Sequence, residues 1–164
     1  MSFRRKFVGE NMNLSEFLAQ FGIAEVPKGE LVGRSYFEFR DRALLSRRPF
    51  FIGKCLAHVR GPVLVPGVDL LQFIGKKAKY KVSVSPEGEW LFICGRDIFG
   101  KSVVGQSDAG IGDRVAVLNV RGECIGYGDV IAPLSEKKVV IRRLFDLGDL
   151  LRRERRTKRS NRTN

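Results

Sequence analysis

The stretch GIGDRVAVLNVRGECIGYGDVI, at residues 110–131, limits the possible fold more strongly than any other part of this chain. Its first half is rich in valine and leucine, which favour a pleated and partly buried surface. A turn is predicted over 119–123, where Gly122 can adopt the positive φ that a tight hairpin turn requires. Gly126 and Gly128 are two residues apart, so they lie on one face of the second strand and permit a bend or the close approach of another backbone. The stretch therefore predicts a β-hairpin with more glycines than a plain edge hairpin requires.

Short strand-forming segments recur through the second half of the chain, separated by turns rich in glycine and proline. They are 79–84, 89–94, 114–120, 123–131 and 138–144. Five short strands with such turns are typical of a small barrel or sandwich. A short helix is predicted over 146–153, with aspartate early and arginine late, as the helix dipole favours. We expect Trp90 in the core, and we expect Tyr127 in the interior rather than exposed for stacking on a base.

The clearest helix signal in the first half lies at 14–21, where apolar residues recur at helical spacing. Asn13 is suited to be the N-cap, and Glu16 three residues later completes a variant of the capping box. Gly22 is expected to close the helix. This segment therefore predicts an amphipathic helix that packs on a core.

Strands are predicted over 31–39 and 50–59, followed by a short helix over 68–74 that ends at Gly75. The chain thus has the α+β fold class, with a small N-terminal domain of helix and strands followed by a β-barrel with short helices. The expected segments are an N-terminal extension at 1–12, an α+β domain at 13–76, the barrel domain at 77–153 and a basic, disordered tail at 154–164.

The charge of the chain is unusual. It has 30 lysines and arginines against 18 aspartates and glutamates, a formal net charge of +12. Such an excess attracts polyanions, either nucleic acid or an anionic membrane surface. No run approaches the roughly 18 apolar residues that a membrane-spanning helix needs, and the basic start is not followed by an apolar signal core. We therefore expect a cytoplasmic protein, with translation starting at Met1 or at Met12.

Little in the sequence indicates catalysis or metal binding. Cys55, Cys94 and Cys124 are far apart and form no CxxC pair, so we expect small, buried, reduced side chains rather than a disulfide or a zinc site. His58, three residues after Cys55, would still leave a metal two ligands short. As the single histidine of the chain, it also offers little for acid–base or triad chemistry. We expect no metal, no cofactor and no enzymatic activity.

Residues 95–102, GRDIFGKS, match the phosphate-loop pattern GxxxxGK followed by serine or threonine. A working loop of this kind leads straight into a long helix whose N-terminus faces the phosphate, within a parallel α/β sheet. Here the residues at 103–112 include too many glycines for that helix, and the surrounding segments predict antiparallel strands. We therefore reject a nucleotide-binding function. We expect a short helical turn at 96–99, with Lys101 available to an external phosphate.

Five segments together resemble the C-terminal half of the Nip-seven family of ribosome biogenesis factors, in its archaeal-type version. They are AKYKVSVSP at 78–86, EWLFICG at 89–95, GDRVAV at 112–117, IGYG at 125–128 and DLGDLLRR at 146–153. In that family this half is a PUA domain, a small β-barrel with short helices that binds RNA. The N-terminal half is similar more loosely, through FFIGKC at 50–55 and VDLLQF at 68–73. The region between Tyr36 and Phe50 is shorter than in the family and lacks a helix found there.

The resemblance implies a non-catalytic RNA-binding protein that acts in the biogenesis of the large ribosomal subunit and in pre-rRNA processing. Its partners would be RNA, above all pre-rRNA, and other ribosome assembly factors, with no membrane and no small-molecule substrate. An alternative is an RNA-binding accessory factor for RNA modification or translation initiation, because PUA-like modules occur in both. Attachment to an anionic membrane surface through the basic stretch 141–156 is a further alternative.

The resemblance also places RNA contacts on the basic last strand and at the end of the barrel. The expected RNA-binding residues are Lys137, Lys138, Arg142, Arg143, Arg152, Arg153 and Lys101. Because side chains alternate along a strand, Arg142 and Arg143 should point to opposite faces, so at most one of them shares a face with Lys138.

Two further groups of basic residues each have two interpretations. The tail at 155–164 is either a solvated, non-specific arm or a defined RNA contact. The four arginines at 40–48 either solvate a loop or extend the basic surface onto the N-terminal domain. They are Arg40, Arg42, Arg47 and Arg48.

Overall fold

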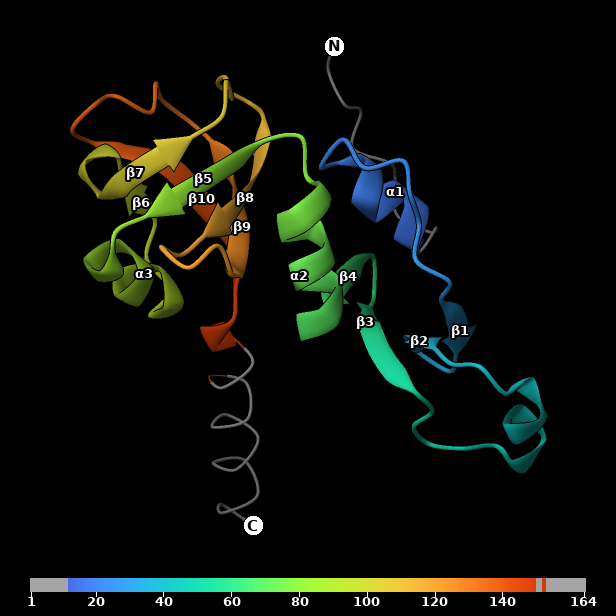
Figure 1. Cartoon of the computed structure of the whole chain (residues 1–164). Helices are drawn as coiled ribbons and strands as arrows, with labels where there is room; N and C mark the ends of the chain where they lie inside the picture. The colour runs from blue at the N-terminus through green and yellow to red at the C-terminus, as the bar shows by residue number, and fades with distance from the viewer. Residues whose placement is uncertain (1–11, 150–151, 153–164) are drawn as a thin grey trace. The chain divides into compact units, whose positions relative to one another are not determined.

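The computed structural model describes residues 12–149 and residue 152 (Figure 1). These residues form two compact units, the first ending at Phe73 and the second beginning at Ile74. The first unit contains a small antiparallel sheet and a helix, and the second is a nearly closed barrel of six strands with short helices. The predicted α+β fold class is therefore confirmed. The expected N-terminal extension, apart from Met12, and the expected tail at 154–164 lie outside the described residues.

The first helix, α1 (Leu14–Ala19), begins where the sequence predicts. The Asn13 side chain accepts a hydrogen bond from the Glu16 amide at 2.8 Å, and the Glu16 carboxylate accepts one from the Asn13 amide at 3.4 Å. This capping box provides partners for amides that a helix N-terminus otherwise leaves unpaired. The apolar face of α1 is buried, as its periodicity predicts.

The sheet of the first unit contains four antiparallel strands in the order β1-β2-β3-β4. They span Glu30–Val32 (β1), Ser35–Glu38 (β2), Lys54–Arg60 (β3) and Val63–Pro66 (β4). The single strand predicted over 31–39 is instead a hairpin, because Gly33 adopts a φ of 63° and turns the chain back. A short 3-10 helix, η1 (Arg42–Arg47), lies between β2 and β3, and β3 begins at Lys54 rather than at Phe50.

The helix α2 (Val68–Lys77) continues beyond the end predicted for it at Gly75. A β-carbon at Gly75 would lie 2.6 Å from the β-carbon of Cys124 and 3.3 Å from the Leu118 side chain. Glycine is present there because the last turn of the helix, which belongs to the second unit, packs tightly against the barrel strands, not because the helix ends.

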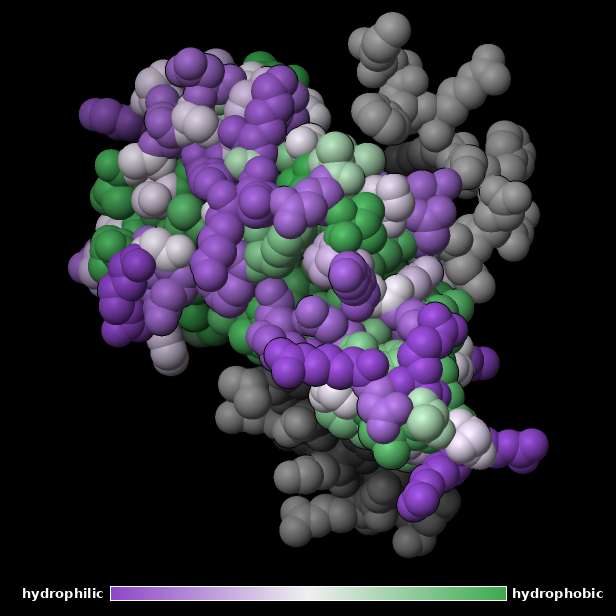
Figure 2. All heavy atoms as spheres, turned by 45° about the vertical axis from the view of Figure 1, so that its right-hand side comes forward, coloured by the Kyte–Doolittle hydropathy of each residue, from purple (hydrophilic) through white to green (hydrophobic). Residues whose placement is uncertain are grey.

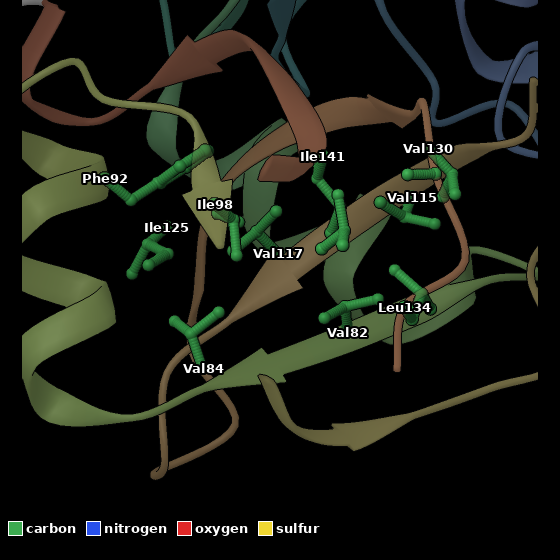
Figure 3. Packing of buried hydrophobic residues seen from close by; sticks show 12 residues of the cluster. Val82, Val84, Phe92, Ile98, Val115, Val117, Ile125, Val130, Leu134 and Ile141 are labelled. Carbon is green, nitrogen blue, oxygen red and sulfur yellow. The ribbon is translucent and has the colours of Figure 1, made fainter. Parts of the chain in front are cut away.

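Six strands form the barrel sheet of the second unit, in the order β6-β10-β9-β8-β5-β7. They span Lys81–Val84 (β5), Ile98–Phe99 (β6), Val103–Gln106 (β7), Arg114–Leu118 (β8), Cys124–Val130 (β9) and Val139–Asp146 (β10). The β5–β8 pair is parallel and the other pairs are antiparallel. Aliphatic side chains and Phe92 fill the interior, as Figure 3 shows for Val82, Val115 and Ile141. The spacing of short strands predicted a small barrel or sandwich, and the structure shows the barrel.

The β8–β9 hairpin shows the close backbone approach that its glycines predict. A β-carbon at Gly126 would collide with the Phe145 carbonyl oxygen, and a β-carbon at Gly128 would collide with the Arg142 carbonyl oxygen. Both oxygens belong to β10, which pairs with β9. The two glycines are therefore required by the packing of the hairpin against the last strand.

One predicted strand is wrong, because residues 89–94 belong largely to a helix, α3 (Pro86–Ile93). Ser85 is its N-cap and accepts a hydrogen bond from the Gly88 amide at 3.2 Å. The proline follows at the first helical position, where no intrahelical amide bond is lost. This local start signal outweighs the β-forming tendency of the aromatic and branched residues after it. The core position predicted for Trp90 is also wrong, since its side chain is 68% exposed.

The interior position predicted for Tyr127 is confirmed. The residue is 6% exposed, and its ring stacks on the ring of Phe145 with 5.6 Å between centroids. The Arg114 guanidinium lies over the same ring at 5.9 Å. Tyr127 therefore belongs to the packing of the barrel and is not available to stack on a base.

The helix predicted over 146–153 is found only in part. Asp146 still belongs to β10, whereas Gly148, Asp149 and Arg152 are helical. Leu147 forms a turn between them, and residues 150, 151 and 153 lie outside the described part of the chain. Among the helices that the structure describes, none has the length and apolar character needed to cross a membrane.

Candidate nucleic-acid interface

The edge of the barrel at β6 and β10 brings together basic residues that are far apart in the sequence. Val139 pairs with Phe99, and the Gly100 amide donates a hydrogen bond to the Lys138 carbonyl oxygen at 3.0 Å. Glycine is required at position 100, since a β-carbon there would collide with the Glu136 carbonyl oxygen. We call the four exposed basic residues at this edge the β6–β10 cation cluster. They are Lys101, Lys137, Lys138 and Arg142.

Most of this positive charge is not neutralised by the protein. Lys138 forms an ion pair with Glu136 at 2.8 Å, but both side chains are largely exposed, so the pair contributes little and can exchange for another anion. Within the described part of the chain, Lys101 and Lys137 form no ion pair. Hydrophilic side chains cover much of the surface seen in Figure 2, with smaller apolar areas between them.

Arg142 lies opposite Asp129 of β9 in the strand register. The Asp129 carboxylate is already held by Arg114, through contacts of 2.9 Å and 3.2 Å from two guanidinium nitrogens to the two carboxylate oxygens. Such a bidentate pair is the stronger form of an arginine–carboxylate contact. Arg142 itself is exposed and forms no ion pair with any residue that the structure describes.

Arg143 and Arg152 have a different environment from the cation cluster. Both guanidinium groups contact the same oxygen, Oδ2 of Asp146, at 2.9 Å and 2.6 Å respectively. The Asp146 side chain is completely buried, and the two arginines are only about one-third exposed, at 28% and 35%. The backbone amide of Arg143 also donates to the Asp97 carboxylate at 2.8 Å. These two arginines therefore neutralise a buried charge and are not free to bind phosphate without exposing it.

Of the seven predicted RNA-binding residues, the structure thus brings four together and places two others around Asp146. The seventh, Arg153, lies outside the described residues, as does the tail at 155–164. Arg142 is exposed while Arg143 turns toward Asp146, consistent with the alternation of side chains along a strand.

Phe99 is a candidate contact that sequence reasoning missed. Its ring is 42% exposed at the β6 edge, beside Val139 of β10 and next to the cation cluster in the chain. An exposed aromatic ring among cations is suited to stack on an unpaired base. Phe99 lies within the GRDIFGKS segment, and its exposure depends on the pairing of β6 with β10, which no local pattern in the sequence indicates.

The phosphate-loop pattern does not have the strand-loop-helix architecture of a working phosphate loop. Gly100–Ser102 form a short 3-10 turn, η2, which leads into β7 and not into a long helix. The Ser102 carbonyl oxygen accepts a hydrogen bond from the Ser85 amide at 2.8 Å, and Ser102 is buried against Gly88. The helical turn expected at 96–99 therefore lies a few residues later, and Lys101 projects from it at the surface.

The three cysteines do not share the buried environment that we expected. Cys124 is buried, Cys55 is half-buried and Cys94 is exposed. Burial raises the pKa of the Cys124 thiol to about 12, so this side chain stays protonated at neutral pH. The Cys55 sulfur lies 3.5 Å from Nε2 of His58, and among the described residues no group of three potential ligands surrounds a metal position.

The helix α3 presents a shallow apolar hollow that the sequence did not predict. It is lined by Pro86, Glu87, Trp90 and Leu91. The nearby Glu87 and Glu89 carboxylates make this surface unfavourable for phosphate. It is therefore distinct in chemistry from the β6–β10 cation cluster.

A family model matches most of the barrel unit, and one curated relative matches about half of the chain. Residues 80–155 match the family model described as the UPF0113 PUA domain. The UPF0113 protein of Archaeoglobus fulgidus is 35% identical over 86 residues, which cover 49% of this chain and 49% of that protein. The chain thus spans about half the length of the curated relative it matches.

Two solved structures are similar over most of the chain. A conserved PUA domain protein from Thermoplasma acidophilum has a TM-score of 0.56 and 22% identity, covering 85% of this chain and 89% of its own. A PUA domain from Aeropyrum pernix K1, solved as a tartrate complex, has a TM-score of 0.51 and 16% identity, covering 87% of each chain. At these identities the likeness shows the fold alone. Together with the family match, it confirms a PUA-like barrel in the second unit.

Proposed function

We propose that this chain is a non-catalytic RNA-binding factor of the Nip-seven type, which acts in the biogenesis of the large ribosomal subunit and in pre-rRNA processing. The β6–β10 cation cluster is its contact with RNA phosphates. The observation that carries this proposal is the position of Lys101, Lys137 and Arg142. They are exposed cations, without ion-pair partners in the described part of the chain, at the edge of a barrel that matches a PUA domain. PUA domains are RNA-binding modules.

The chemistry of this edge favours binding over catalysis. Exposed lysine and arginine side chains release counterions from RNA when they contact its phosphates, and this favours association. Phe99 adds a surface on which a base can stack. Lys101 is assigned to a phosphate of RNA, because its segment leads into a strand and cannot enclose a nucleotide in the manner of a phosphate loop.

The first test removes the cluster charge without disturbing Asp146. A variant with Lys101, Lys137, Lys138 and Arg142 replaced by alanine leaves Arg143 and Arg152 in place. We expect its affinity for a large-subunit pre-rRNA fragment to fall at least about tenfold, because contacts with phosphates are lost. The slope of log affinity against log salt should also become shallower, by about 0.7–0.9 for each lost phosphate contact. Fluorescence anisotropy at several salt concentrations measures both quantities.

A matched control removes four exposed positive charges from the first unit. It replaces Lys28, Arg34, Lys54 and Arg60 by alanine. We expect this control to change RNA affinity and salt slope much less than the cluster variant. Equal losses in the two variants would mean that net charge alone attracts RNA, and unchanged affinity in the cluster variant would disprove the assigned contact.

Crosslinking in cells followed by sequencing of the attached RNA tests the biological role. Large-subunit pre-rRNA is the expected product. Transfer RNA or messenger RNA would instead support an accessory role in RNA modification or translation initiation. The absence of crosslinked RNA would contradict the RNA-binding function itself.

A further inference from the structure

We propose that the first unit carries a second RNA contact, in which Phe50 stacks on an unpaired base while Arg47 and Arg48 bind the adjacent phosphates. The site lies in the connection between β2 and β3, which we call the Arg40–Phe51 loop. It contains the cyan helical turn η1 in Figure 1. The ligand class rests on the proposed function, but the residues are separate from those of the β6–β10 cation cluster.

The exposure of Phe50 distinguishes this loop. Its side chain is 101% exposed, the highest value among the described apolar residues, whereas the following Ile52 is 5% exposed. Phe51 between them packs edge-on against the buried ring of Phe37, with 5.1 Å between centroids and an interplanar angle of 79°. The chain on one side of Phe50 is therefore anchored to the sheet, and Phe50 itself projects into solvent.

Both ends of the loop are held by local contacts. Asp41 caps η1 by accepting a hydrogen bond from the Ala43 amide at 2.9 Å. At the other end Gly53 adopts a φ of 62°, and a β-carbon there would collide with the Glu38 carbonyl oxygen. The loop is thus a defined surface, and ordering it costs less on binding than ordering a free segment would.

Arg48 has an unusual backbone conformation. Its φ of 51° places it in the left-handed region, and it is the one non-glycine residue with positive φ in the described part of the chain. Its amide donates to the Leu45 carbonyl oxygen at 3.0 Å, which closes η1 just before Pro49 and Phe50. Arginine is a poor choice for this conformation if only the turn mattered, since glycine or asparagine adopts it more readily. The turn places two arginines, Arg47 and Arg48, immediately before Pro49 and the exposed Phe50.

The positive charge of the Arg40–Phe51 loop favours binding to a polyanion. Its segment 40–51 contains four arginines and one aspartate, a net charge of +3. Arg42 is paired with Glu30 at 3.1 Å, whereas Arg40, Arg47 and Arg48 form no ion pair with any described residue. Exposed cations beside a fully exposed ring are the combination that binds single-stranded nucleic acid, through phosphates and base stacking together. RNA is therefore the ligand that we assign.

A fluorescence experiment on the full chain detects the stacking directly. Trp90 is the single tryptophan, so the double variant Trp90→Phe, Phe50→Trp places one reporter in the loop. We expect a single-stranded oligouridine to quench this tryptophan, and an abasic oligonucleotide of equal length to quench it much less. The matched control, Trp90→Phe with Val63→Trp, places the reporter at another exposed apolar site of the same unit and should show little quenching.

Affinity measurements give an independent test. Phe50→Ala should weaken oligouridine binding by about 5- to 150-fold, the range for losing one stacked base. Arg47→Gln with Arg48→Asn should lower the salt slope by about 1.4, and asparagine tolerates the left-handed conformation at position 48. Circular dichroism verifies that each variant remains folded.

The outcomes separate this inference from the proposed function. RNA binding that depends on the β6–β10 cation cluster but is unchanged in the Phe50 and arginine variants would overturn the inference and leave the function intact. If the loop variants lose RNA affinity and the cluster variant does not, the RNA contact at the loop is supported and the contact assigned to the β6–β10 cation cluster is overturned. A blue shift of the loop tryptophan emission with anionic phosphatidylserine vesicles, at a salt concentration where oligouridine causes no quenching, would overturn the RNA assignment. The absence of any RNA binding by the unmodified chain would contradict both proposals.

Discussion

Arg143 holds the completely buried carboxylate of Asp146 through a 2.9 Å contact between Nη1 and Oδ2. A second arginine, Arg152, binds the same oxygen, while Oδ1 has no hydrogen-bond partner among the described residues. A buried carboxylate is stable only while positive charge compensates it. The basic end of β10 therefore contains one arginine that maintains the fold and one, Arg142, that remains free for a ligand.

We predict that Arg143→Ala destabilises the barrel, whereas Arg142→Ala does not. Removing one partner of a fully buried pair costs about 3–5 kcal/mol. The loss here should be smaller, about 1–3 kcal/mol, because Arg152 still compensates Asp146 and Arg143 is partly exposed. Urea unfolding measures both variants. Equal stability of the two variants would show that the ion pair does not support the fold.

Gly126→Ala should destabilise the barrel more strongly than any exposed glycine substitution. The added methyl group would overlap the Phe145 carbonyl oxygen and approach Phe92 to 2.6 Å, so β9 and β10 must separate. We expect a loss of about 3 kcal/mol or more in the free energy of unfolding, at the upper end for overpacking. The matched control is Gly105→Ala in β7, where the nearest atom would lie 3.6 Å away. A similar loss in both variants would contradict the packing argument.

The stability of the chain should depend on Cys124 at alkaline pH. Burial raises the pKa of this thiol from 9.0 to about 12 in the folded state. Below pH 9 both states are protonated and the thiol does not change stability with pH. As pH rises from 9 toward 12, the unfolded thiol ionises first, so stability falls by up to about 1.4 kcal/mol per pH unit. Cys124→Ala should remove this component of the slope, and an unchanged slope between pH 9 and 11 would contradict it.

Labelling with a thiol reagent tests the same burial at neutral pH. Cys94 is exposed and should react rapidly in the folded protein, while Cys124 should react only when the protein unfolds. Mass spectrometry of the labelled peptides distinguishes them. Rapid labelling of Cys124 without denaturant would show that the interior of the barrel opens more readily than its packing indicates.

Glu123, in the β8–β9 turn, should make a contribution to folding stability that is lost at acidic pH. Hydrogen bonding from the Asn119 side chain, followed by the charge of Arg121, lowers the pKa of the Glu123 carboxyl from its usual 4.5. A lowered folded pKa contributes stability above the unfolded value, and this contribution is lost as pH falls through the folded value. Glu123→Gln should weaken that acid dependence. NMR titration should show the Glu123 pKa moving up toward 4.5 in Asn119→Ala, and no movement would exclude the hydrogen bond as its main cause.

Several local features could be predicted from the sequence because they depend on a few neighbouring residues. The α1 capping box joins Asn13 to Glu16, and the tight β8–β9 hairpin follows from its glycines. The lack of a long helix after the phosphate-loop pattern was also predicted correctly, because the residues at 103–112 contain too many glycines for one. The start of α3 also has a local signal, because Ser85 is a suitable N-cap and the proline after it is favoured at the first helical position.

Other features depended on partners distant in the sequence. Gly75 was predicted to end a helix, yet it lies within α2. The residue is glycine because Cys124 leaves no room for a side chain at this position. Trp90 is exposed because α3 turns it away from the barrel interior. No local pattern contains this information, since it arises only when the strands pair.

Periodicity, glycine spacing and charge belong to the chain itself, so the α+β class, a compact β unit of short strands and a strongly basic last strand could be predicted from the sequence. Which of the cations are available to a ligand depends on the tertiary structure. Pairing of β6 with β10 brings Lys101 to Lys137 and Lys138, while the buried carboxylate of Asp146 takes up Arg143 and Arg152. The physical reason is desolvation: a charge that folding removes from water must be paired within the protein, and a charge left in water remains free to bind a ligand.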